Sequence, residues 1–423
     1  MTLTLVFDYS AGMEDAIPEI IEAVTREVPF ELLLVFAFVL LFSLMFRRLG
    51  QPAVMGCFVG GFVLHLLSHF TGIDFTQQLR LEPETIFLLI GILIFNEGLS
   101  VEMESLVKNR EEIAGLAIVG TFVGVALCGV TLRVLFGLEW VVAVIVGTML
   151  IPTDAGAVLA VLSRLGVGER WRSMIAGESI FNDPISLIIF GLAVGAWHGQ
   201  SPDWPAAILR SVVGSCVLGI VLGYLFYRIY RLLSDPVNEL ILSGMLFTAS
   251  FFMAERLHMS GFLSVAVASI FVGNKKTLCM DEETVETLDR FWEALAIAVE
   301  GYLFVMIGAA IPLENLVRHA DVGLVAIAVV TVARSVTVHS LLWVLDRFFR
   351  QDIPWRWRVI VDLGGLHVGV TMAILLNLPK DLPHLEEIQV MGYYVITWSV
   401  LGMPFLGQVA LKALGLQREV PER

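Results

Sequence analysis

Long apolar stretches recur along the chain and constrain its fold more than any other feature. They run for about 20 residues, the length that a helix needs to cross the hydrocarbon core of a bilayer. Hydrophobic residues make up 57% of the 423 residues and charged residues only 16%, whereas soluble proteins carry roughly 25% charged residues. The mean hydropathy is +0.82. The sequence therefore predicts an all-α polytopic membrane protein embedded in a lipid bilayer.

The apolar stretches are separated by brief loops, and we expect about thirteen transmembrane helices. They cover residues 29–46, 51–70, 85–100, 112–136, 140–163, 173–197, 206–230, 238–254, 260–273, 293–312, 321–345, 358–378 and 388–411. Residues 1–28 are expected to form an extramembrane or interfacial segment, and residues 412–423 a short tail.

The distribution of basic residues predicts the orientation in the membrane. If the N-terminus is outside, most of the 27 Lys and Arg residues fall in loops on the inner side, as the positive-inside rule requires. We therefore expect a multi-pass protein of the cell (inner or plasma) membrane with a cytoplasmic C-terminus. The net charge of −14 gives no sign of nucleic-acid binding. The four scattered cysteines do not suggest disulfides or a metal site.

The segment 173–197 carries a polar stripe at mid-depth. Glu178 and Asn182 lie one helical turn apart, and so do Ser179 and Asp183. Pro184 follows at once and removes a backbone donor, which frees a carbonyl one turn earlier. Intramembrane carboxylates are costly and usually functional, so this stripe is the first candidate for a functional site.

The preceding segment, 140–163, is interrupted rather than striped. Pro152, Thr153, Asp154 and Gly156 predict an unwound midsection, which is tolerated at membrane depth only where it lines a cavity or packs against protein. The segment 358–378 has a matching interruption at residues 363–369. Thirteen spans divide into six, a linker and six, so we expect two inverted six-helix repeats whose broken helices cross at the midplane.

Asp183 is the leading candidate for a carrier of the substrate. A carboxylate that is partly removed from water holds a proton more readily, and the proton then competes with a small cation for the same oxygens. This competition alone produces exchange. The alternative is a structural carboxylate neutralised by a base, but Arg334 is the only basic residue deep within a span.

The neighbouring polar residues have more than one possible role. Thr153 and freed carbonyls offer the oxygen ligands that hard cations prefer. Asp154 suits equally the N-terminal cap of a half-helix and an ion site. Arg334 needs an intramembrane partner, and Glu178 is the leading candidate for a structural ion pair. The alternative is that Glu178 takes part in transport directly.

Three further polar positions bear on charge within the membrane. Asn182 stands where a second carboxylate could have stood, which predicts one proton per monovalent cation and electroneutral exchange. Glu300 could pair with His367 or Arg334, or line the access path. His367 could titrate near neutral pH or be a buried, hydrogen-bonded histidine. Glu97 ends a span, and we expect it at the cytoplasmic interface.

These motifs also carry a resemblance. A Thr153-Asp154 pair in a broken span, followed by Glu178-Ser179-x-x-Asn182-Asp183 in the next span, resembles the NhaP/NHE type of monovalent cation:proton antiporter. The likeness covers nearly the whole membrane region. It is also seen in Phe291-Trp292-Glu293 with the residues 303–308, in Arg334-Ser335-Val336 and in Gly364-Gly365-Leu366.

The resemblance implies an NhaA-like antiporter fold, no cofactor and a homodimer. In such a protein, residues 29–100 and 238–312 would form a dimerisation domain, residues 112–197 and 321–411 a mobile core, and residues 206–232 a linker helix. The core would move against the dimerisation domain in an elevator-like cycle. The cation would be coordinated by Asp183 together with Ser179, Glu178 and the Thr153 region, with Asn182 holding Asp154.

Three positions depart from the family pattern. Ala155 stands where the family usually has Pro, Glu300 where it usually has Asn, and His367 where it usually has Arg. Glu300 and His367 change the charge within the membrane. We therefore expect the pH dependence and the choice of cation to differ from those typical of the family.

We therefore expect a secondary-active Na+(Li+)/H+ antiporter. One alternative is a K+/H+ antiporter with the same fold, because oxygen ligands suit either ion. A second alternative is a membrane sensor or scaffold that has lost transport. An intramembrane enzyme is disfavoured, because the HExxH, GxSxG and Ser-Lys motifs are missing from the sequence.

Overall fold

The computed structural model describes residues 30–71, 83–154, 159, 168–201, 203–233, 235–349, 353–365 and 367–414. These residues form helices joined by short turns. The helices are α2 (Phe30–Arg48), α3 (Ala53–Thr71), α4 (Pro83–Ser100), α5 (Met103–Lys108), α6 (Arg110–Ala114), the π-helical η2 (Gly115–Gly120), α7 (Thr121–Phe136), α8 (Trp140–Leu150), α10 (Glu169–Trp197), α11 (Trp204–Tyr230), α12 (Pro236–Arg256), α13 (Gly261–Gly273), the 3-10 turn η3 (Lys276–Leu278), α14 (Glu282–Ala309), α15 (Leu313–Arg318), α16 (Ala320–Phe349), α17 (Trp355–Leu363), α18 (Gly369–Leu376), α19 (Leu385–Thr397), the π-helical η4 (Trp398–Gly402) and α20 (Met403–Ala413).

The predicted all-α membrane architecture is confirmed. Within the described residues, eight helical stretches are long and apolar enough to cross a membrane, and two shorter apolar helices, Thr85–Ser100 and Trp140–Leu150, accompany them. The predicted span ranges coincide with helices or with interrupted pairs of helices. The number of spans and the inverted repeat stay predictions. The segment 1–28 and most of the second half of the 140–163 span lie outside the described residues.

Several helices begin at a residue whose side chain caps the first turn. Asp203, Asp235, Ser260 and Asp281 each accept a hydrogen bond from a backbone amide three residues later. Such caps satisfy otherwise unpaired amides, and the acidic ones also complement the helix dipole. Hydrogen bonds from the hydroxyl and the amide of Thr284 lower the pKa of the Asp281 carboxyl, which lies outside the membrane-spanning segments.

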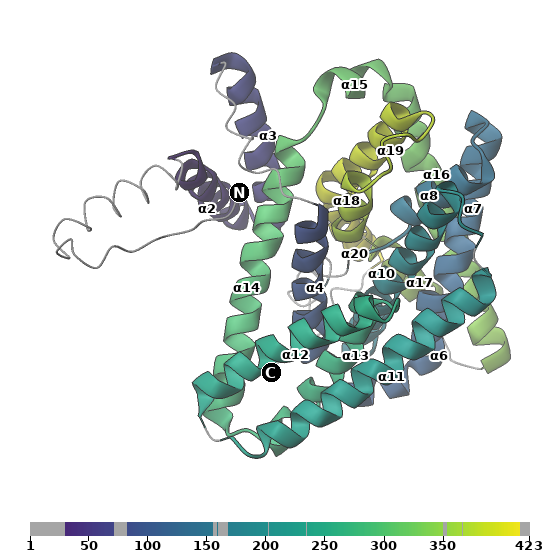
Figure 1. The fold of residues 1–423 in the computed structure, drawn as a ribbon. Coiled ribbons are helices and arrows are strands. Elements are labelled where there is room, and N and C mark those ends of the chain that lie inside the picture. Colours follow the sequence, from purple (N-terminus) through teal and green to yellow (C-terminus); the bar gives the residue numbers. More distant parts are fainter. Residues whose placement is uncertain are drawn as a thin grey trace.

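The helices pack into two groups. One group contains α2, α3, α4 and α11 to α14, and the other contains α6, η2, α7, α8, α10 and α16 to α20. Figure 1 shows the first group along the left and lower sides and the second on the right. The groups meet where α4 contacts α18 and where α13 contacts α10. The functional assignment of the two groups as dimerisation domain and core stays a prediction.

Glycines allow the helices within each group to approach closely. A Cβ added at Gly61 would lie 2.1 Å from the carbonyl oxygen of Val305, and one at Gly308 would lie 2.1 Å from that of Phe58. Helices α3 and α14 therefore touch backbone to backbone at two levels. A Cβ added at Gly147 would lie 2.7 Å from the carbonyl oxygen of Val125, so α8 also approaches α7 closely. Small residues at helix crossings are typical of membrane bundles, where close packing replaces the hydrophobic effect.

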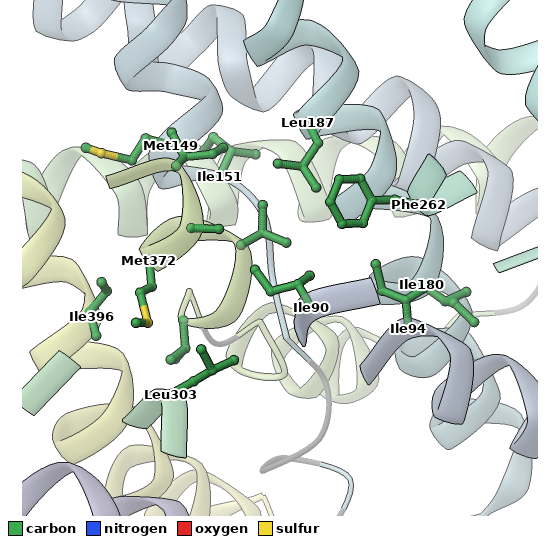
Figure 2. Packing of buried hydrophobic residues seen from close by; sticks show 14 of the residues in the cluster. Ile90, Ile94, Met149, Ile151, Ile180, Leu187, Phe262, Leu303, Met372 and Ile396 are labelled. Atoms are coloured by element: carbon green, nitrogen blue, oxygen red, sulfur yellow. The ribbon is translucent and has the colours of Figure 1, made fainter. Parts of the chain in front are cut away.

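Apolar side chains surround the two interrupted helices. Met149 and Ile151 come from the end of α8, Met372 from α18, Ile94 from α4 and Leu303 from α14, and Figure 2 shows them around one region of the bundle. All five are less than 9% exposed. Polar groups at the interruptions therefore lie within a low-dielectric shell, where each unpaired charge is costly.

Candidate ion-binding site

The two interruptions meet in the middle of the second helix group. Helix α8 ends at Leu150, and the chain continues without helix through Asp154, while α17 ends at Leu363 and α18 begins at Gly369. A Cβ added at Gly365 would lie 2.8 Å from Cγ2 of Thr153. The missing side chain at position 365 thus allows the unwound backbone segments to come into contact.

His367 joins the second interruption to the first. Its Nδ1 lies 2.9 Å from the carbonyl oxygen of Pro152, and its backbone amide donates to Oγ of Ser399 at 3.2 Å. A carbonyl oxygen can only accept, so Nδ1 carries the proton in this contact. The side chain is 5% exposed. Of the two roles considered for His367, the geometry favours the buried, hydrogen-bonded histidine.

The stripe on α10 is tied directly to Thr153. The hydroxyl of Ser179 donates to the carbonyl oxygen of Thr153 at 2.7 Å, and Nδ2 of Asn182 donates to its Oγ1, also at 2.7 Å. All three residues are at most 3% exposed. The resemblance implied that Asn182 holds Asp154, whereas in this structure the amide of Asn182 bonds the neighbouring threonine.

Asp183 contributes an oxygen that lacks a partner. Its Oδ1 is inaccessible to solvent and has no hydrogen-bond donor among the described residues, and the same is true of Oδ1 of Asn182. Asp183 also interacts electrostatically with Glu97, Asp154 and Glu178, all of which are acidic. A buried acceptor without a donor costs free energy, and a cation or a proton would remove that cost.

Asp154 lies at the start of a half-helix. Its Oδ2 is 3.7 Å from the position that a Cβ would take on Gly369, the first residue of α18. A carboxylate is stabilised near a helix N-terminus because the amide dipoles point toward it. The side chain is half-buried, so this location is compatible with both roles considered for Asp154.

Glu178 and Arg334 form a buried ion pair. Nη1 and Nη2 of Arg334 bind Oε1 and Oε2 of Glu178, the second contact at 3.0 Å. Nη2 also donates to the carbonyl oxygen of Val361 at 3.1 Å, so Arg334 connects α10, α16 and α17. The side chains are 3% and 11% exposed for Glu178 and Arg334 respectively. A two-pronged contact of this kind is the strongest form of carboxylate recognition.

Two further acids within apolar helices are Glu97 on α4 and Glu300 on α14. Glu97, predicted at the cytoplasmic interface, is half-buried in the structure, and its electrostatic neighbours are Asp154 and Glu300. The pairing of Glu300 with His367 or Arg334 and its location along the access path stay predictions; its electrostatic neighbour in the structure is Asp154. The signal available in the sequence was the same for both, since each is an acid within an apolar helix.

The donor set of the site is dominated by oxygen. The described residues contain no group of three or more His, Cys, Asp or Glu side chains close enough together to hold a metal ion. Beside the acids, the hydroxyl of Ser179 and both the hydroxyl and the main-chain carbonyl of Thr153 come together at the first interruption. Hard cations prefer such oxygens, and broken helices that face an ion are a recurring device of secondary transporters.

A helical membrane bundle with two interrupted helices and an unpaired acid beside them defines a membrane ion transporter. A family model described as sodium/hydrogen exchanger, transmembrane, matches residues 34–414, and the chain belongs to this family. It is therefore a transporter of the antiporter class rather than an enzyme.

Individual relatives agree with the family. The Na(+)/H(+) antiporter NhaH of Halobacillus aidingensis is 28% identical over 351 residues, which cover 81% of this chain and 85% of that protein. The Na(+)/H(+) antiporter NhaP of Pseudomonas aeruginosa is 30% identical over 344 residues, which cover 78% of this chain and 79% of that protein.

A solved structure shows that the fold is shared. The sodium proton antiporter MjNhaP1 from Methanocaldococcus jannaschii matches with a TM-score of 0.72 over 91% of this chain and 100% of that chain. The sequence identity is 18%, so this likeness concerns the fold alone.

Proposed function

We propose that the protein exchanges Na+ for H+ across its membrane and that both ions compete for Asp183. The observation that carries the proposal is the buried Oδ1 of Asp183, which has no hydrogen-bond partner among the described residues. A proton or a Na+ ion would satisfy this oxygen, but the two would not do so together. Membership in the exchanger family supports the choice of ions.

The remaining ligands would come from the first interruption and from α10. Thr153 offers main-chain and hydroxyl oxygens, and Ser179 lies within hydrogen-bond distance of the Thr153 carbonyl. Glu178 is a weaker candidate for direct binding, because Arg334 already engages both of its oxygens. We assign the Glu178–Arg334 pair a structural role.

The exchange would be electroneutral, one proton for one cation. Asn182 occupies the position beside Asp183 where a second acid would add a second proton to the cycle. The amide of Asn182 donates a hydrogen bond to Thr153. This bond connects the first interruption to the helix that carries Asp183 and adds no charge.

Alternating access would follow from motion of one helix group against the other in an elevator-like cycle. The group containing α6, α7, α8, α10 and α16 to α20 would carry the ion, and helices α2 to α4 and α12 to α14 of the other group would form a homodimer, with α11 as the linker helix. We place the N-terminus outside and the C-terminus in the cytoplasm of a cell membrane, in keeping with the distribution of basic residues.

The oxygen ligands of the site suit more than one alkali ion. Li+ fits the same oxygen ligands as Na+, and K+ would define a K+/H+ antiporter with the same site. A sensor or scaffold without transport is disfavoured by the buried, unpartnered oxygen of Asp183 next in sequence to Asn182, whose amide bonds Thr153.

Exchange in proteoliposomes with an internal pH dye tests the function. Purified protein is reconstituted, a pH gradient is imposed, and NaCl, LiCl or KCl is added outside in turn. We expect Na+ to cause proton movement, and Li+ to do so as well. Movement with K+ alone would establish the potassium alternative, and silence toward all three ions would favour the sensor.

A further inference from the structure

The unwound backbone around Thr153 is held from two sides. From α10, the hydroxyl of Ser179 donates to the carbonyl oxygen of Thr153 and the amide of Asn182 donates to its hydroxyl, both at 2.7 Å. From the second interruption, Nδ1 of His367 donates to the carbonyl oxygen of Pro152 at 2.9 Å. Two consecutive carbonyls of the first interruption are thus bonded to two different parts of the bundle.

These bonds to two consecutive carbonyls fix the backbone conformation at Thr153. A peptide unit is planar, so the bond to the Pro152 carbonyl sets the plane that precedes the Cα atom of Thr153. The bond from Ser179 sets the plane that follows this atom. With both planes set, the directions of the Thr153 carbonyl and of its side chain are set as well. The contact of His367 therefore reaches Thr153 through the peptide unit that joins it to Pro152.

Steric contact also limits the movement of Thr153. A Cβ added at Gly365 would lie 2.8 Å from Cγ2 of Thr153 and 2.9 Å from Nε of Arg334. The threonine methyl group therefore lies against the backbone of the second interruption. Arg334 is itself bonded to Glu178 and to the carbonyl oxygen of Val361, so the unwound segment has fixed neighbours on this side.

His367 is held in place by its own backbone. Its amide donates to Oγ of Ser399 at 3.2 Å, and Ser399 is fully buried in η4. His367 is buried too, so its bond to the Pro152 carbonyl is shielded from water. A hydrogen bond in such surroundings is stronger than one in solvent, and its donor is anchored by a second bond to the bundle.

We propose that His367 is a positioning residue that sets the preference of the site for Na+ over K+. Oxygen ligands that cannot follow a change in ion radius discriminate between cations, whereas mobile ligands adapt to either ion. By holding the Pro152 carbonyl, His367 keeps the oxygens of Thr153 at the spacing that suits the smaller ion. His367 does not touch the cation itself. This inference rests on the proposed exchange of Na+ for H+, with Thr153 as a ligand.

Uptake of radiolabelled Na+ by full-length protein in proteoliposomes, with K+ as a competitor, tests this preference. The assay gives the KM for Na+ and the inhibition constant for K+. We expect His367→Ala to raise the KM for Na+ by about fivefold, the effect of one lost hydrogen bond, at the wild-type maximal rate. The inhibition constant for K+ should change less than this KM, so the ratio of the K+ constant to the Na+ constant should fall. A purely structural histidine would instead lower the maximal rate or the folded yield and leave the ratio unchanged.

Two further variants separate the hydrogen bond from the bulk of the side chain. His367→Gln retains an N–H donor and should restore much of the wild-type ratio. His367→Leu fills the space without a donor and should have the lowered ratio, which keeps the test valid if the alanine variant fails to fold. His339→Ala is the matched control, because Nδ1 of His339 contacts a carbonyl of its own helix, that of Ser335. A wild-type ratio in His367→Leu, or a ratio in His367→Gln no better than in His367→Leu, would overturn the inference.

Thermal unfolding in detergent separates this inference from the proposed function, because an ion that binds the folded protein raises the unfolding temperature. At constant ionic strength, we expect NaCl to stabilise the wild type and His339→Ala more than KCl does, and this difference should shrink in His367→Leu. If the wild type shows the difference but no Na+/H+ exchange, the proposed function fails and the positioning role stands. If the wild type exchanges Na+ for H+ and His367→Leu keeps both the ratio and the difference, the positioning role is wrong and the function stands.

Discussion

Glu178 and Asp183 lie little more than one turn apart on the same helix, yet their surroundings are opposite. Both oxygens of Glu178 are bonded to Arg334. Asp183 has a buried oxygen with no donor among the described residues, and its electrostatic neighbours are acids. Both residues carry a carboxylate of similar intrinsic chemistry. The position of the guanidinium group of Arg334 gives hydrogen bonds to both oxygens of Glu178 and none to Asp183.

The different surroundings of Glu178 and Asp183 give the two ends of the polar stripe on α10 different roles. A buried ion pair contributes little net stability relative to apolar packing, but breaking it leaves an unpaired charge at a high cost. Arg334 also bonds the carbonyl oxygen of Val361, so this end of the stripe fixes three helices to one another. The Asp183 end retains the capacity to bind and release an ion because nothing in the described protein satisfies it.

The substitution Asp183→Asn should have the largest effect on transport. It preserves the shape of the side chain and removes the group that binds H+ or Na+ in turn, so exchange should fall to the background of empty liposomes. Expression and thermal stability should stay at the wild-type level. Retained exchange in the pH-dye assay would show that another carboxylate carries the ions.

The substitution Arg334→Ala should have the largest effect on folding. It leaves Glu178 buried without its partner, at a cost of about 3–5 kcal/mol, and thermal unfolding in detergent should report the loss. The double variant Glu178→Gln, Arg334→Ala removes the stranded charge and should recover part of the stability. A single variant as stable as the wild type would refute the structural assignment of the pair.

Much of the fold could be predicted from the sequence, because apolar length and interruptions are local properties of the chain. The breaks at Pro152 and at Gly364-Gly365 are read directly from residues that disrupt helices. The contact of Arg334 with Glu178 could be predicted as well, since a buried cation must find an acid. These inferences needed no knowledge of how the helices are arranged.

The positions of Glu97 and Glu300 could not be predicted for the opposite reason. Whether an acid near the end of a short helix such as α4 reaches the interior depends on the tilt and neighbours of that helix. The packing of α4 against α14 and α18 is a tertiary property. The sequence identified both residues as intramembrane or near-membrane acids but could not determine which groups they face.

The substitution Asn182→Asp would make the Asp183 end of the stripe more acidic. A second acid beside Asp183 would add a second proton to the cycle and make exchange carry net charge. A potential across a membrane contributes about 2.3 kcal/mol per charge per 100 mV. With valinomycin and K+ gradients, we expect wild-type rates that are independent of potential and variant rates that depend on it. A wild-type rate that responds to potential would exclude electroneutral exchange.

The substitution Ser179→Ala should have the smallest effect of these four, and it tests whether the link between α10 and Thr153 matters for binding. It removes the hydrogen bond to the Thr153 carbonyl, worth about 1 kcal/mol, and should raise the KM for Na+ by roughly fivefold without abolishing exchange. Ser186→Ala is the matched control on the same helix, because the buried hydroxyl of Ser186 has no partner among the described residues. Equal effects of the two substitutions on the KM for Na+ would mean that the hydroxyl of Ser179 contributes to packing alone. The proposal that the carbonyl of Thr153 binds the cation would then be weakened.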